Sequence, residues 1–172
     1  MPERDRLLDS LRRVHDGTPW HGPSRAEVLR DITAREAAYR ASEDSHTLWE
    51  IVLHMRSWTE EVLRRARGAV PAEPARGDWP AMPSKLNDDT WRETLASLDE
   101  AHEALLAYVS KMSEDARASR VADRPGDPEN SGITRRAMIR SLAEHDVYHT
   151  GQVAVLKRIA RAALAAGSPH PR

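Results

Sequence analysis

The sequence predicts an all-α protein built as a four-helix bundle. Several long segments repeat their apolar residues at the helical spacing, and no segment alternates with the two-residue period of a strand over a useful length. Helix-capping signatures stand at the starts of these segments. With 172 residues, one domain over 1–172 would bury about 70% of the surface that the unfolded chain exposes.

Net charge, the absence of cysteine and hydropathy exclude several classes of partner and of functional site. Lys and Arg number 26 against 27 Asp and Glu, a net charge of −1, and there is no Cys. We therefore expect no nucleic-acid partner, no disulfide, no thiol nucleophile and no thiolate metal ligand. The N-terminus lacks an apolar signal core, and no run approaches the ~18 apolar residues of a membrane span. A cytoplasmic protein without a membrane partner is expected.

Two arginine clusters are the features that could favour nucleic acid. They are interleaved with acidic residues, so we interpret them as solvated helix faces. The clusters contain Arg64, Arg65, Arg67, Arg135, Arg136 and Arg140.

The first half of the chain predicts one helix over 3–15, two short helices and one long helix. Gly17 is suited to end the first of them. In a capping box, an N-cap side chain and a residue three positions later each bond the other's backbone. Such boxes pair Ser24 with Glu27, Thr33 with Glu36, and Thr47 with Glu50. The last box opens a helix to about Arg67, ended by Gly68.

The second half predicts two more long helices separated by long loops. Residues 69–86 are rich in Pro and Ala, Asn87 is suited to cap a helix to about Ala116, and 117–132 form a second loop before a helix over about 133–165. Both loops exceed the roughly 2–8 residues that usually join antiparallel neighbours. Either loop could cross the bundle from end to end, at ~3.3 Å per residue. The pattern does not choose between topologies.

The last helix carries the chemistry. His145, His149 and Gln152 fall in the middle of its apolar stripe, which also holds Met138, Leu142, Leu156 and Ala163. Imidazoles at i and i+4 share a face, and leaving them unpaired in an apolar interior costs roughly 1–3 kcal/mol each. Their spacing suits a divalent transition metal. Asp146 takes the place of the glutamate in H-E-x-x-H, so no general base follows, and we expect it to be solvated or to support a ligand from outside.

A metal site needs a third ligand from another helix. His54 lies on the flank of the apolar stripe of the helix predicted from Thr47 to about Arg67. His102 lies centrally on the apolar stripe of the helix predicted from Asn87 to about Ala116. Position alone slightly favours His102. A single histidine on an apolar face is more often a hydrogen-bonded core residue, so the pattern leaves both open.

Two motifs resemble the DinB/YfiT-like superfamily of bacterial metalloproteins. They are TLWEIVLHMRSW at 47–58 and HDVYHTGQ at 145–152, and the connector PWHGPS at 19–24 resembles a feature of one branch. The resemblance implies a four-helix bundle in up-down-down-up order with crossover loops. It also implies a divalent cation, nickel or zinc, held by His54, His145 and His149. His102 then becomes a core or rim histidine.

The resemblance also implies an activity on a small molecule. Relatives include transferases and isomerases that use low-molecular-weight thiols, and proteins described as metal-dependent hydrolases. Three neutral imidazoles leave coordination positions open for water or a thiolate. The alternative is a non-catalytic, stress-response module that binds a metal or ligand. A homodimer is compatible with such a bundle, although no residue pattern indicates one.

Two residues are candidates to support the site. Glu50 lies one turn before His54 and could orient it or act as a base, but its capping box with Thr47 competes and is the more favoured role. Gln152 lies one turn after His149 and could donate to a substrate or to bound water.

Three aromatic residues have open roles. Tyr148 is off the ligand stripe and is expected to pack. Trp20 and His21 either close over the site or form a structural turn.

Overall fold

The computed structural model describes residues 3–122 and 132–167, and it has no strand within those ranges. The all-α prediction is confirmed. The helices are α1 (Glu3–His15), α2 (Arg25–Leu29), α3 (Ala34–Ala37), α4 (Leu48–Ala66), α5 (Asp88–Lys111), α6 (Glu114–Ala118) and α7 (Arg135–Ala165).

The predicted helix starts are confirmed. The capping boxes that begin at Ser24, Thr33 and Thr47 are complete, with hydroxyl and glutamate each accepting a backbone N–H. Asn87 caps α5 in the same reciprocal manner with Thr90. These caps satisfy backbone donors that the first helical turn leaves unpaired.

The third long helix ends earlier than expected, at Lys111 rather than about Ala116. Met112 adopts an extended conformation (φ −66°, ψ 133°), and Ser113 caps the separate helix α6 by accepting from the N–H of Ala116. A serine followed by acidic residues is a helix-start signal, so the break could have been foreseen. Of the predicted loop 117–132, residues 123–131 lie outside the described ranges.

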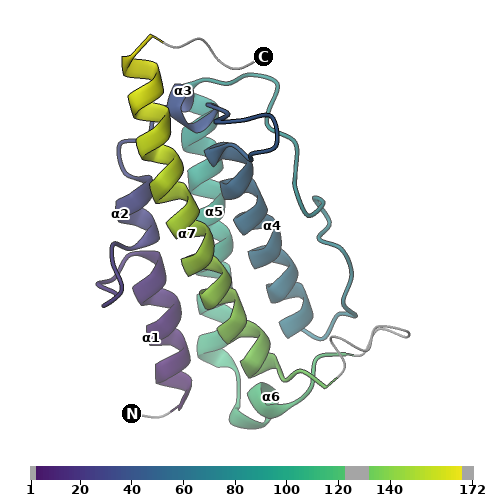
Figure 1. The fold of residues 1–172 in the computed structure, drawn as a ribbon. Helices are drawn as coiled ribbons and strands as arrows, with labels where there is room; N and C mark the ends of the chain where they lie inside the picture. Colours follow the sequence, from purple (N-terminus) through teal and green to yellow (C-terminus); the bar gives the residue numbers. More distant parts are fainter. Residues whose placement is uncertain (1–2, 123–131, 168–172) are drawn as a thin grey trace.

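The long helices run up, down, down and up along the chain. In Figure 1, α1 and α7 rise while α4 and α5 descend, and the connection between α4 and α5 climbs the length of the bundle. Two hydrogen bonds between α4 and α5 agree with the parallel direction of these helices. Trp49 at the start of α4 donates to Thr94 near the start of α5 (3.0 Å), and Tyr108 near the end of α5 donates to the carbonyl of Ala66 at the end of α4 (3.0 Å).

A polar layer separates two apolar clusters at mid-height. One cluster includes Leu11, Leu105 and Ile139, and the other includes Trp49 and Val153. Buried polar side chains lie between the two clusters. On α5, His102 lies between Leu98 and Leu105, and on α7, Asp146, His149 and Thr150 lie between Ile139 and Val153. Burying so many polar groups is costly unless they are paired or serve a ligand. These buried polar groups make the middle of the bundle the candidate location of a functional site.

The surface arginines mostly have acidic partners. Arg64 and Arg65 both pair with Glu61, and Arg140 pairs with Glu144. No helix within the described ranges is both long enough and apolar enough to cross a bilayer.

Candidate metal centre

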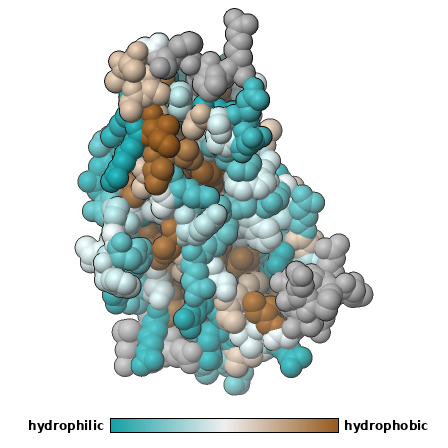
Figure 2. Space-filling model, viewed as in Figure 1, coloured by the Kyte–Doolittle hydropathy of each residue, from teal (hydrophilic) through white to brown (hydrophobic). Residues whose placement is uncertain are grey.

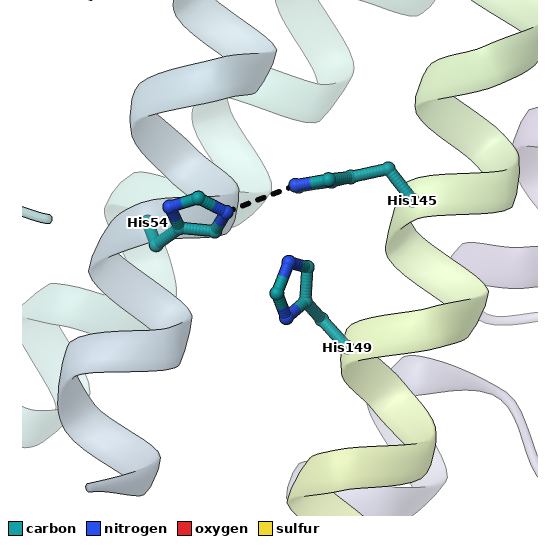
Figure 3. A group of neighbouring side chains, drawn as sticks. All are labelled: His54, His145 and His149. Carbon is teal, nitrogen blue, oxygen red and sulfur yellow. Dashed lines mark hydrogen bonds between the residues drawn. The ribbon is translucent and has the colours of Figure 1, made fainter. Parts of the chain in front are cut away.

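Three imidazoles from two helices meet at mid-height of the bundle. His54 comes from α4, and His145 and His149 come from α7 (Figure 3). The Nε2 atoms of His54 and His145 are 3.0 Å apart, and the His149 ring centroid lies 4.7 Å from that of His54 and 4.4 Å from that of His145. One nitrogen of each ring lies within 4.8 Å of those of the other two.

Two of the rings are fixed by acceptors on their outer nitrogens. Nδ1 of His54 donates to the backbone carbonyl of Asp78 (2.7 Å), and Nδ1 of His149 donates to Oε1 of Gln152 (2.6 Å). Since these oxygens can only accept, each Nδ1 carries the proton and each Nε2 keeps its lone pair. This is the tautomer that metal-binding histidines need.

The third ring has a looser outer contact. Nδ1 of His145 faces Oδ1 of Asp146 at 3.5 Å, longer than a normal hydrogen bond. Its side chain is 27% exposed, whereas His54 and His149 are buried. His145 therefore forms the open side of the cluster.

Burial favours the neutral form of the His54 and His149 rings. It lowers the pKa of His54, and it lowers that of His149 to about 4, with positive charge on His145 as a further cause. Neutral imidazoles with free lone pairs bind a cation without first losing a proton. The donor set and its tautomers thus fit a divalent transition metal.

The loop after α4 holds His54 from outside. Ser57 donates to the carbonyl of Gly77 (2.7 Å), and Trp58 donates to the carboxylate of Asp78 (2.7 Å). Trp79 stacks on His54 with centroids 4.0 Å apart, and its own ring stacks on His46 at 3.5 Å. Sequence reasoning treated 69–86 as a connection only, although a tryptophan within a loop rich in Pro and Ala was a usable signal.

A buried ion pair lies behind His145. Nη1 of Arg25 is 2.9 Å from Oδ2 of Asp146, and both side chains are almost fully buried. Nη2 of Arg25 also donates to Nδ1 of His15 (2.6 Å). Asp146 is therefore not solvated. Its place beside His145 agrees with the alternative expectation, that it supports a metal ligand from outside. Arg25 was not singled out from the sequence, because an arginine in the first turn of a short helix is unremarkable.

His102 is buried away from the three rings. Its ring packs against that of His15, with centroids 4.2 Å apart and planes tilted by 30°. Burial, with the charge of Arg25, lowers the pKa of His102 to about 3. The position on the α5 stripe that slightly favoured His102 as a ligand directs it toward α1 instead. His54 reaches the α7 histidines from the flank of its own stripe.

The supporting candidates have different positions. Glu50 completes the capping box with Thr47 and pairs with Arg40 (2.7 Å). Burial alone would raise the pKa of Glu50, but the hydrogen bonds from Thr47 and Arg40 lower it overall. Gln152 contacts His149 directly and donates its amide to the Tyr148 hydroxyl (3.2 Å).

The remaining aromatic candidates lie outside the cluster. Tyr148 is 64% exposed, and Trp20 is 94% exposed. His21 lines a hollow of about 300 Å³ together with Val147 and Ala154. None of these rings contributes an atom to the three-histidine cluster.

Comparison with known proteins identifies the family. No curated protein and no solved structure matches the chain. The family model of the DinB superfamily matches residues 24–153, a range that includes the three clustered histidines. The match covers most of the chain, and the chain belongs to the DinB superfamily.

Proposed function

We propose that this protein is a metal-dependent enzyme acting on a small molecule, with His54, His145 and His149 holding a divalent nickel or zinc ion. The observation that supports this most is the fixed tautomer of two rings. His54 and His149 each donate the Nδ1–H to an acceptor, which leaves a lone pair on Nε2 of each ring. Nε2 of His54 faces Nε2 of His145 across the cluster at 3.0 Å, the contact drawn as a dashed line in Figure 3.

The surroundings favour thiol transfer over hydrolysis. A cation held there supplies a Lewis acid and open positions for a water or a thiolate. The nearby carboxylates are already engaged: Asp146 with Arg25, Asp78 with Trp58, and Glu50 with Arg40. Each of these three carboxylates therefore has a partner, and their contacts assign none of them the role of a general base.

A thiol at such a cation needs no general base. Free thiols have a pKa of about 8.5, close enough to neutrality for a bound divalent cation to hold the thiolate. The chain has no cysteine of its own, so the thiol would come from a small-molecule substrate. Gln152, which accepts from Nδ1 of His149, would keep the His149 ring in place as the substrate arrives.

Elemental analysis of purified variants tests the ligand set. We expect about one metal ion per chain in the unaltered protein, and loss of the metal in His54→Ala, His145→Ala and His149→Ala. His102→Ala is the matched control, because it removes a buried imidazole outside the cluster. The ligand set is wrong if His102→Ala loses the metal while His54→Ala retains it.

Turnover assays separate the enzyme from the alternative, a non-catalytic binding module. The metal-loaded protein is mixed with low-molecular-weight thiols and alkylating electrophiles, and in parallel with esters and amides. Thiol consumption that disappears in His149→Ala supports transfer. Retained metal with no turnover across either panel supports the binding module. The cytoplasmic location and the homodimer remain predictions.

A further inference from the structure

A hollow of about 560 Å³ lies beside the metal centre. One wall is the face of α7 that carries Gly151, Gln152, Val155 and Leu156, and the other is formed by the first turn of α4 with the segment 44–46. Its volume falls within the range of roughly 300–1,000 Å³ that small-molecule pockets occupy.

Two contacts join this hollow to the histidine cluster. Gln152 lines the hollow, and its Oε1 accepts from Nδ1 of His149. His46 lines it from the other side and stacks on Trp79, which stacks on His54. A molecule in the hollow would therefore lie next to residues that hold two of the three rings.

The walls are apolar and carry little charge. Ile51, Val155 and Leu156 supply aliphatic surface, and Figure 2 shows hydrophobic atoms gathered over the upper half of α7. Val155 is 57% exposed, so a ligand covering it would remove apolar surface from water. Asp44 is the one formally charged residue among those lining the hollow, and no lysine or arginine is among them.

Gly151 is an independent sign that the space has a use. A Cβ at this position would meet no atom within 4 Å, so packing does not require glycine. Glycine inside a helix costs about 0.5–1 kcal/mol relative to alanine. At mid-helix it leaves the wall of the hollow open.

We propose that this hollow binds the apolar, non-anionic body of the substrate while its reactive group faces the three histidines. The inference rests on the proposed function for the role of the histidines. It adds that the substrate carries an aliphatic or aromatic portion and no negative charge near Asp44.

Binding of six-carbon probes to the metal-free protein tests the hollow by itself. Hexanol, hexylammonium and hexanoate share one apolar body and differ in charge. Amide and side-chain NMR shifts of Gly151 and Gln152 report on binding. We expect hexanol and hexylammonium to move these signals and hexanoate to bind about two- to fivefold more weakly, as expected for one exposed like charge. Equal binding of hexanoate, or shifts elsewhere only, would overturn the proposal.

Variants localise the effect. Val155→Glu should weaken hexanol binding at least several-fold, whereas Ile159→Glu, one turn further along α7 and also exposed (41%), should leave it unchanged. Asp44→Asn should abolish the discrimination against hexanoate. Similar losses in both glutamate variants would contradict the assignment.

A second series keeps this proposal distinct from the proposed function. Cobalt-loaded protein is titrated with linear thiols from two to six carbons, and the thiolate-to-cobalt absorption is recorded. We expect affinity to rise about fourfold per methylene, a fold-change that corresponds to the usual burial of one CH₂. Thiol binding with no dependence on chain length refutes the hollow alone. Six-carbon binding to the metal-free protein without any thiol absorption refutes the thiol-transfer function alone.

Discussion

Arg25 and Asp146 form a buried ion pair, with Nη1 and Oδ2 2.9 Å apart, between the short helix α2 and the middle of α7. The pair ties a residue far from the histidine motif to the carboxylate that follows His145. A buried ion pair adds little net stability, because removing both charges from water is costly. Removing one partner is strongly destabilising, because the other charge is then buried and unpaired. That asymmetry makes the pair testable.

Arg25→Met should lower the free energy of unfolding by about 3–5 kcal/mol, because Asp146 is left buried without a counter-charge. Urea denaturation of the metal-free protein measures the change. The double variant Arg25→Met with Asp146→Asn should recover most of it. Arg140→Met is the control, since that arginine is 75% exposed beside Glu144 and its loss should cost less than about 1 kcal/mol. A large loss in the control, or none in Arg25→Met, would refute the role of the pair.

Gln152→Ala should weaken metal binding by about 10- to 100-fold, because Nδ1 of His149 loses the acceptor that fixes its tautomer. Competition against a chelator measures the affinity. Gln152→Glu keeps an acceptor and should restore much of the binding. Tyr148→Phe removes only the hydroxyl that accepts from the Gln152 amide, so we expect a small change. An equal loss in Tyr148→Phe would show that the exposed hydroxyl matters as much as the ring contact.

The metal-free protein should lose stability as pH falls below about 6.5, because the pKa of His102 is about 3 in the folded state and about 6.5 unfolded. Between those values the unfolded chain binds the extra proton, so unfolding becomes easier with acid. His102→Gln should reduce the slope by up to about 1.4 kcal/mol per pH unit in this window. Above pH 7 the two proteins should differ by a constant amount. Parallel curves down to pH 4 would contradict the buried neutral ring.

Gly151→Ala should raise the free energy of unfolding by about 0.5–1 kcal/mol, since a Cβ meets nothing there and glycine is unfavourable in a helix. Thermal unfolding of the metal-free protein measures the gain. The same variant should bind hexanol more weakly than the unaltered protein. Loss of stability instead would mean that the wall of the hollow is tighter than this geometry shows.

Local signals in the sequence predicted the helices well. The capping boxes at Ser24, Thr33 and Thr47 place helix starts to the residue, because they depend on side chains three positions apart. The end of α5 was missed, where Ser113 starts a new helix against a continuing apolar stripe. Apolar spacing reports burial and not backbone continuity.

The site was predictable in part. The i, i+4 spacing of His145 and His149 is a property of one helix and could be recognised in the sequence. Choosing His54 over His102 needed the resemblance, because the choice depends on which helix faces which flank of α7. Asp78 and Trp79 reach His54 through tertiary contacts of a loop, which no local pattern encodes.

His54 and His145 are separated by 91 positions along the chain. A ribosome must therefore release the chain through His145 before these two rings can meet, and the helices made before that point offer a cation one imidazole of the three. Metal would therefore enter only once α7 has been made and has docked on the other helices.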